Sequence, residues 1–156
     1  MAKVSPIPAG YHSVTPYLVM DGAAKAIEFY KQAFDATELL RMPMPDGKVA
    51  HAEIKIGDSP VMMADATEEF KGPRAFGGTP VSIMIYVEDV DRIFRQALAQ
   101  GATQLRPIVD QFYGDRSGTL VDPFGHVWTV ATHIEDVSPE EMDRRMAKMV
   151  EEHGKA

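Results

Sequence analysis

Two stretches that repeat each other decide the fold of this chain: "TPYLVMDGAAKAIEFYKQAFDATELLR" at residues 15–41 and "VSIMIYVEDVDRIFRQALAQGATQLRP" at residues 81–107. Each reads as a short apolar strand, an acidic residue, an amphipathic helix, and then Ala-Thr at the start of a new strand. The Ala-Thr pair at residues 36–37 recurs at residues 102–103, a spacing of 66 residues. Because the parts follow in the same order, internal duplication explains the match better than a coincidence between two common units.

The two predicted helices share one design. Asp89 stands where it can cap the second helix, which Gly101 ends, and Asp21 stands at the matching place before the first. Apolar residues recur at helical spacing in both, so each helix is expected to bury one face. These residues are Ala23, Ile27, Tyr30 and Phe34 in the first helix, and Val90, Ile93, Phe94, Ala97 and Leu98 in the second.

Three further strands are predicted after each helix. They cover residues 39–42, 50–56 and 61–64 in the first half, and residues 104–108, 117–121 and 127–132 in the second. Asp122-Pro123-Phe124-Gly125 suits a type I turn before the last strand. The predicted fold class is α+β, with two tandem βαβββ modules at residues 13–65 and 81–135 that together make one domain.

Three segments flank or join the modules. Residues 1–12 form an N-terminal extension, and the linker at residues 66–80, rich in Gly, Pro and charge, is either a plain connection or, less commonly, a lid. Residues 136–156 contain a capping box, Ser138-Pro139-Glu140-Glu141, and an apolar stripe of Met142, Met146, Met149 and Val150. So short a helix is marginal alone in water. We expect it to dock either on its own body or on a second subunit.

Composition excludes several classes of function. The chain has 156 residues, a net charge of −7 and no cysteine. The acidic balance disfavours nucleic acid and anionic membrane as partners. The absence of cysteine excludes thiol nucleophiles, disulfides and thiolate metal sites. With neither a long apolar run nor a signal-like start, the chain is expected to be cytoplasmic.

The paired modules, with "IEFYKQAF" in the first helix and "DPFGHVW" before the last strand, resemble the glyoxalase, bleomycin-resistance and extradiol-dioxygenase group, the vicinal oxygen chelate superfamily. The resemblance covers about residues 13–134, and "YGDRSGTLVDPFGHVWTVATH" at residues 113–133 resembles its bacterial glyoxalase-like branch. It implies two curved sheets that face each other as a cup. The superfamily includes lyases, isomerases, dioxygenases, thiol transferases and drug-binding proteins, so the fold alone does not fix the function.

The resemblance also implies where a metal would bind. Metal-dependent members place one His, Glu or Gln ligand on the first strand and one on the last strand of each module, and these donors converge on a divalent cation. The matching positions here are Thr15 (or Val14), Met63, Ser82 and Thr129. Because hydroxyls and a thioether are poor ligands for such a cation, the sequence predicts no metal and no cofactor. A divalent metal is the alternative.

Two histidine arrangements are candidates for chemistry. His126 and His133 are seven residues apart, which places them on opposite faces of a strand. His51 and Glu53 are two apart and share a face, so they are weak candidates for an acid and a base or for metal ligands. Such a pair more often decorates a solvated face.

The stretch "QFYGDRSG" offers candidate ligand contacts. Arg116 could clamp an anionic group while Tyr113 and Phe112 stack on a flat one; an ordinary surface turn with an Asp115–Arg116 ion pair is the alternative. In the last strand, Thr129 is expected to line the cup while Trp128 faces the helices, and Asp122 is expected to accept hydrogen bonds from backbone N–H groups.

These observations favour a binding protein. The first hypothesis is a metal-free cup that holds a small amphiphilic molecule, with Thr15, Met63, Ser82 and Thr129 on its wall. The second is a metal-dependent lyase, isomerase or dioxygenase with non-standard ligands, and the third is a structural or regulatory dimer with a filled cup. A homodimer is expected because members of this superfamily commonly dimerise.

Overall fold

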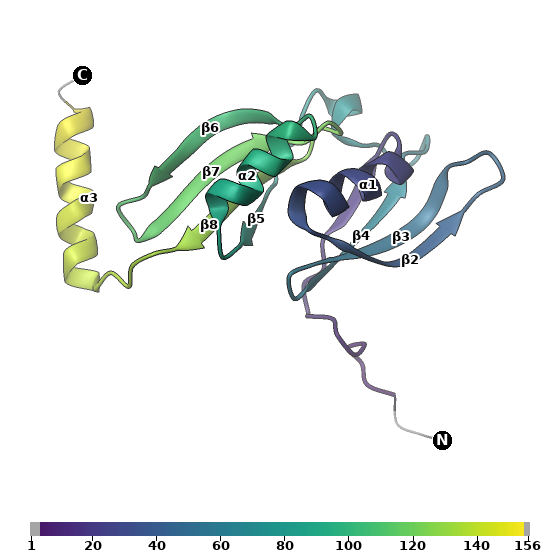
Figure 1. Ribbon diagram of the computed structural model, residues 1–156, viewed down its shortest axis with the longest axis horizontal. Helices are drawn as coiled ribbons and strands as arrows, with labels where there is room; N and C mark the ends of the chain where they lie inside the picture. Colours follow the sequence, from purple (N-terminus) through teal and green to yellow (C-terminus); the bar gives the residue numbers. More distant parts are fainter. Residues whose placement is uncertain (1–3, 155–156) are drawn as a thin grey trace.

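The computed structural model describes residues 4–154 of the chain and contains both predicted modules (Figure 1). The first consists of β1 (Tyr17–Met20), α1 (Ala23–Phe34), β2 (Thr37–Pro43), β3 (Val49–Ile56) and β4 (Ser59–Asp65). The second consists of β5 (Ser82–Tyr86), α2 (Val90–Ala99), β6 (Thr103–Asp110), β7 (Asp115–Val121) and β8 (Val127–His133). A short 3₁₀ helix, η1 (Pro73–Phe76), lies in the linker, and α3 (Pro139–His153) follows the second module.

The strands form two four-stranded sheets of the same topology, β1-β4-β3-β2 and β5-β8-β7-β6. In each sheet the first strand of the module runs parallel to the last, and the other neighbours are antiparallel. The sheets lie side by side along the long axis of the molecule, and α1 and α2 adjoin each other near its centre (Figure 1). The α+β class and the duplicated βαβββ modules are confirmed.

Each helix covers one face of its own sheet. Residues alternate along β3, where Ala52, Ile54 and Ile56 are buried towards α1 and the residues between them point the other way. We call the face turned away from the helix the open face of a sheet. Period-two alternation of this kind is what a strand with one buried face requires.

A buried carboxylate joins the two modules. Asp122 accepts hydrogen bonds from the backbone N–H groups of Phe124 at 2.9 Å and His126 at 3.0 Å, which confirms its predicted turn role. Its other oxygen accepts from the Tyr30 hydroxyl of α1 at 2.6 Å and from the Trp128 indole N–H at 2.9 Å. Trp128 is fully buried on the helix side, as predicted. One acidic side chain therefore fixes a turn, an indole and the neighbouring module together.

The helix caps differ from the prediction in the first module. Asp89 caps α2 as expected, accepting from the Arg92 backbone N–H at 2.9 Å. Asp21 does not cap α1; the cap comes from Asp65 of β4, which accepts from the N–H groups of Gly22 at 2.7 Å and Ala23 at 3.1 Å. The reason is local, because the chain turns through a left-handed Gly22 after Asp21 and α1 starts beside the end of β4.

α3 stands apart from the sheets at one end of the molecule (Figure 1). None of its residues is buried. The predicted cap is present, since the Ser138 hydroxyl accepts from the Glu141 N–H at 3.3 Å. Arg145 attaches the helix by a 2.7 Å ion pair with Glu135 and a 3.1 Å hydrogen bond to the Phe112 carbonyl. Within residues 4–154, no helix is both long and apolar enough to cross a membrane.

Candidate functional site

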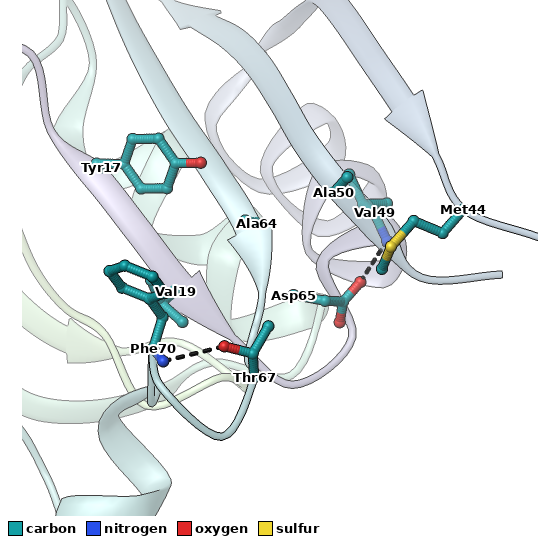
Figure 2. A pocket seen from close by; sticks show the side chains of 9 residues that line it. All are labelled: Tyr17, Val19, Met44, Val49, Ala50, Ala64, Asp65, Thr67 and Phe70. Atoms are coloured by element: carbon teal, nitrogen blue, oxygen red, sulfur yellow. Dashed lines mark hydrogen bonds between the residues drawn. The ribbon is translucent and has the colours of Figure 1, made fainter. Parts of the chain in front are cut away.

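The open face of the first sheet carries an apolar pocket. Tyr17 and Val19 of β1 pair across the sheet with Met62 and Ala64 of β4, so all four side chains share this face. The pocket has a volume of about 560 Å³ and lies where β4 runs into the linker (Figure 2). Its walls are mainly apolar and include Tyr17, Val19, Met44, Val49, Ala64 and Phe70.

The few polar groups at this pocket are already bonded within the protein. Asp65, besides capping α1, accepts from the Val49 backbone N–H at 2.7 Å. The Thr67 hydroxyl accepts from the Phe70 N–H at 3.0 Å, and the Thr67 N–H donates to the Phe70 carbonyl at 2.8 Å. This closed turn holds the exposed Phe70 ring beside Val19 at the pocket edge (Figure 2). The pocket therefore presents hydrocarbon and aromatic surface to a guest.

A row of hydrogen-bonded side chains borders the pocket at Tyr17. The Tyr17 hydroxyl lies 3.0 Å from His51 Nδ1, and His51 Nε2 lies 3.0 Å from Glu53 Oε1. Tyr11, from the segment before β1, donates to the other Glu53 oxygen. The prediction that His51 and Glu53 share a face is confirmed. Their side chains are 23% and 15% exposed, so the pair is partly shielded although it lies on the open face.

The open face of the second sheet carries a different polar cluster. Asp115 is buried, and it accepts from the Tyr86 hydroxyl at 2.8 Å and pairs with His133 Nδ1 at 2.7 Å. His133 Nε2 pairs with Asp136 at 3.0 Å. Hydrogen bonding to Asp115, and then to Asp136, raises the pKa of His133. Sequence reasoning missed this cluster because it treated Asp115 as a surface residue of the "GDRSG" turn.

The positions at which metal-dependent members of the family would hold their ligands do not form a site for a cation here. Met63 is fully buried on the helix side, which corrects its predicted place on the cup wall. Thr15 lies before β1, with its hydroxyl 3.4 Å from the His12 carbonyl. Ser82 and Thr129 meet on the second open face with 3.4 Å between their hydroxyl oxygens. In the described part of the chain, no three His, Asp or Glu side chains are grouped to hold a metal, so these donors do not fit one.

Arg116 also lies away from the open face. Its guanidinium forms 2.8 Å ion pairs with Asp91 of α2 and with Asp110, on the helix side of the second sheet. The anion clamp predicted for Arg116 is therefore placed on the wrong face, and the alternative pairing with Asp115 is also incorrect. Tyr113 and Phe112 pack edge to face with 5.3 Å between their ring centres, in the β6–β7 turn near α3. The structure does not bring these three residues to the first-sheet pocket.

Tyr11 and Tyr17 are site residues that the sequence analysis missed. Tyr17 had a usable signal, since it is a large aromatic side chain at an outward position of the first strand. Tyr11 had none, because it lies in a segment without periodic pattern and reaches Glu53 only through the tertiary fold.

Comparisons with known proteins agree with this architecture. The profile of the Glyoxalase/Bleomycin resistance protein/Dioxygenase superfamily matches residues 11–130. Uncharacterized protein Rv0887c of Mycobacterium tuberculosis is 44% identical over 140 residues, which cover 86% of this chain and 82% of that protein. The structure of TioX from Micromonospora sp. ML1 shares 28% identity with a TM-score of 0.65, covering 79% of this chain and 99% of TioX. Protein PA1353 from Pseudomonas aeruginosa shares 25% identity with a TM-score of 0.66, covering 80% of this chain and 99% of that one.

Proposed function

Because the chain belongs to the glyoxalase/bleomycin resistance protein/dioxygenase superfamily, whose fold hosts both enzymes and drug-binding proteins, we propose that it binds a small, mainly apolar molecule on the open face of its first sheet. The observation that carries this proposal is the apolar pocket of about 560 Å³ between Tyr17, Met44 and Phe70. Ligand sites of this size are commonly lined by hydrophobic and aromatic side chains.

The side chains that line the pocket explain how a ligand would bind there. Tyr17 and Phe70 are exposed aromatic residues that can contact a flat group, and Met44 supplies a flexible thioether that adapts to shape. Removing these surfaces from water contributes about 25 cal/mol per Å² of apolar area buried. The hydrogen-bonded row at Tyr17 gives a polar end, which suits an amphiphilic molecule.

A pocket-filling substitution tests the site. The probe is the uncharged fluorescent dye Nile red, and Ala64→Phe places a ring in the pocket space from β4. We expect Ala64→Phe to weaken dye binding about tenfold or more, which corresponds to roughly 1.4 kcal/mol. Ala99→Phe, at an exposed position at the end of α2, is the matched control. Equal dye affinity in the wild type and Ala64→Phe, with both folded by circular dichroism, contradicts the proposal.

Binding is proposed to need no divalent cation. The family positions here offer hydroxyls on the second sheet and a buried thioether in the first, neither of which suits a hard metal ion. We expect a chelator to leave dye affinity and the melting temperature unchanged. Elemental analysis that finds nearly one metal ion per chain in the purified protein would count against this part of the proposal.

A homodimer is proposed as the working assembly. The open faces expose large apolar side chains, among them Tyr17, Met84 and Tyr86, and α3 exposes Met146 and Val150. Exposed apolar surfaces of this kind commonly mark protein–protein contacts. Deleting residues 138–156 and measuring mass in solution separates the two contributions: a dimer that dissociates depends on α3, and one that persists depends on the sheets. A full-length chain that stays monomeric at all concentrations contradicts the assembly.

A further inference from the structure

The side chains in the row beside the pocket become more exposed from one end to the other, and this order suits proton transfer. Glu53 at one end is the least exposed member, with 15% of its side chain accessible, and His51 follows with 23%. Tyr17 at the other end is 51% exposed and also lines the pocket. The row therefore leads from a shielded carboxylate to a hydroxyl that a bound molecule can touch.

The donors and acceptors available in the row fix the direction of its hydrogen bonds. A glutamate carboxylate only accepts, and Tyr11 already donates to one of its oxygens. The 3.0 Å contact of His51 Nε2 with the other oxygen therefore requires Nε2–H to be the donor. In a neutral imidazole this leaves the lone pair on Nδ1, which then accepts from the Tyr17 hydroxyl at 3.0 Å. Glu53 thus orients His51 as a proton acceptor for Tyr17.

In the similar row on the second sheet, the hydrogen bonds do not leave the histidine free to accept a proton. His133 lies between two carboxylates, Asp115 on Nδ1 and Asp136 on Nε2, so both ring nitrogens face acceptors. An imidazole held in that way favours the doubly protonated form and has no nitrogen free to take up a proton. In the first row, by contrast, the imidazole next to the terminal hydroxyl can take up a proton.

We propose that Tyr17, His51 and Glu53 take up the proton of a bound molecule that carries an acidic hydroxyl, a phenol or an enol, on an apolar body. This inference rests on the proposed binding function. The ligand O–H bond breaks and its proton bonds to Tyr17 Oη, while the Tyr17 proton moves to His51 Nδ1. The products are a ligand oxyanion and an imidazolium between Tyr17 and Glu53, so charge balances and no electron is transferred.

The chemistry of the pocket favours this ligand class. Its walls contain no lysine or arginine among the described residues, so a molecule that arrives as an anion has no counter-charge there. A neutral hydroxyl compound enters at lower desolvation cost, and the oxyanion formed on binding is balanced by the new imidazolium and hydrogen-bonded by Tyr17. In this proposal Tyr17 is the catalytic residue because it touches the ligand, His51 is the final proton acceptor, and Glu53 is a positioning residue.

The test uses 4-nitrophenol, whose ionised form absorbs visible light and whose neutral form does not. With saturating wild-type protein, we expect the ionisation constant of the bound probe to rise about tenfold or more, because a hydrogen bond to an anion is about twice as strong as a neutral one and is joined here by the imidazolium charge. Tyr17→Phe keeps the aromatic ring and removes the hydroxyl, and its bound probe is measured at a protein concentration that saturates this variant. It should lose the rise in ionisation.

Two further variants separate proton uptake from structure. His51→Ala should also lose the rise, and added imidazole should restore part of it, which a purely structural role would not allow. Glu53→Gln should reduce the rise, and Glu53→Asp should retain more of it. If the probe binds the wild type but is ionised equally in the wild type and Tyr17→Phe, the inference fails while the pocket stands. If the probe does not bind the wild type at all, the proposed function fails and the inference falls with it.

Discussion

Replacing Tyr30 with phenylalanine tests whether the Asp122 carboxylate holds the two modules together. The change removes one hydroxyl, whose oxygen lies 2.6 Å from Asp122 Oδ2, and leaves the ring packed against Trp128 with 5.4 Å between ring centres. A hydrogen bond to a charged group contributes about 1.5–3 kcal/mol. Asp122 keeps three other donors, so we expect the free energy of unfolding to fall by about that amount and no more.

The melting temperature of Tyr30→Phe should fall together with its free energy of unfolding. For a chain of this length, each kcal/mol corresponds to about 2–4 °C, so Tyr30→Phe should melt roughly 3–12 °C lower. Trp128 is the only tryptophan and contacts Tyr30 directly, so its fluorescence reports this junction while circular dichroism reports the whole fold. The same loss should appear in denaturant titrations followed by both signals.

The pH dependence gives a second measure of the same contact. Burial, and then the charge of Asp122, raises the pKa of Tyr30 well above its ordinary value of 10.0. Tyr30 therefore ionises more readily in the unfolded chain, so the stability it provides is complete below about pH 10 and is lost as the pH rises further. Tyr30→Phe should remove this contribution to the alkaline loss.

Tyr113→Phe changes the same atom at an exposed site and should shift stability by less than about 0.5 kcal/mol. If Tyr30→Phe melts within 1–2 °C of the wild type, which is about 0.5 kcal/mol for a chain of this size, then the Asp122 contact does not join the modules as described.

Three further predictions follow from single contacts. Asp65→Ala leaves the N–H groups of Gly22, Ala23 and Val49 without their acceptor, so urea titration should show that the free energy of unfolding falls by about 1–3 kcal/mol or more. A fall under about 0.5 kcal/mol would show that Asp65 does not cap α1. Gly114→Ala would force a Cβ against the Glu135 carbonyl, so it should destabilise the protein more than Gly47→Ala, where φ is also positive but nothing lies within 4 Å. Equal melting temperatures of the two variants would refute this. Asp115 and then Asp136 raise the pKa of His133, so the stability that protonated His133 provides is complete below about pH 6.5 and is lost as the pH rises through the pKa of the folded protein. NMR titration should place the pKa of His133 above 6.5, and a value at or below 6.5 would contradict the Asp115–His133 pairing.

The duplicated fold was predictable because its signals are local. Period-two alternation marks the strands, a 3.6-residue stripe marks each helix, and the Asp122-Pro123-Phe124-Gly125 turn is encoded by its own residues. His51 and Glu53 were placed on one face by the same reasoning. Local rules of this kind need no knowledge of which strands are neighbours.

The error at Met63 shows where such rules stop. A constant repeat spacing of 66 residues maps Thr129 onto Met63, but Asp65 and Thr132, which bond the N-termini of α1 and α2, are 67 residues apart. One extra residue moves a position to the opposite face of a strand. Met62 therefore lies on the open face and Met63 lies in the core.

The sequence by itself determined the elements and their order, because these depend on residues a few positions apart. Only the tertiary structure decided that Asp65 caps α1 from β4, that Asp122 receives Tyr30, and that Tyr17 and Tyr11 extend the His51–Glu53 pair into a row. These contacts join residues 34 to 92 positions apart. Which distant side chains meet depends on how the sheets and helices pack, and no periodic pattern in the chain carries that information.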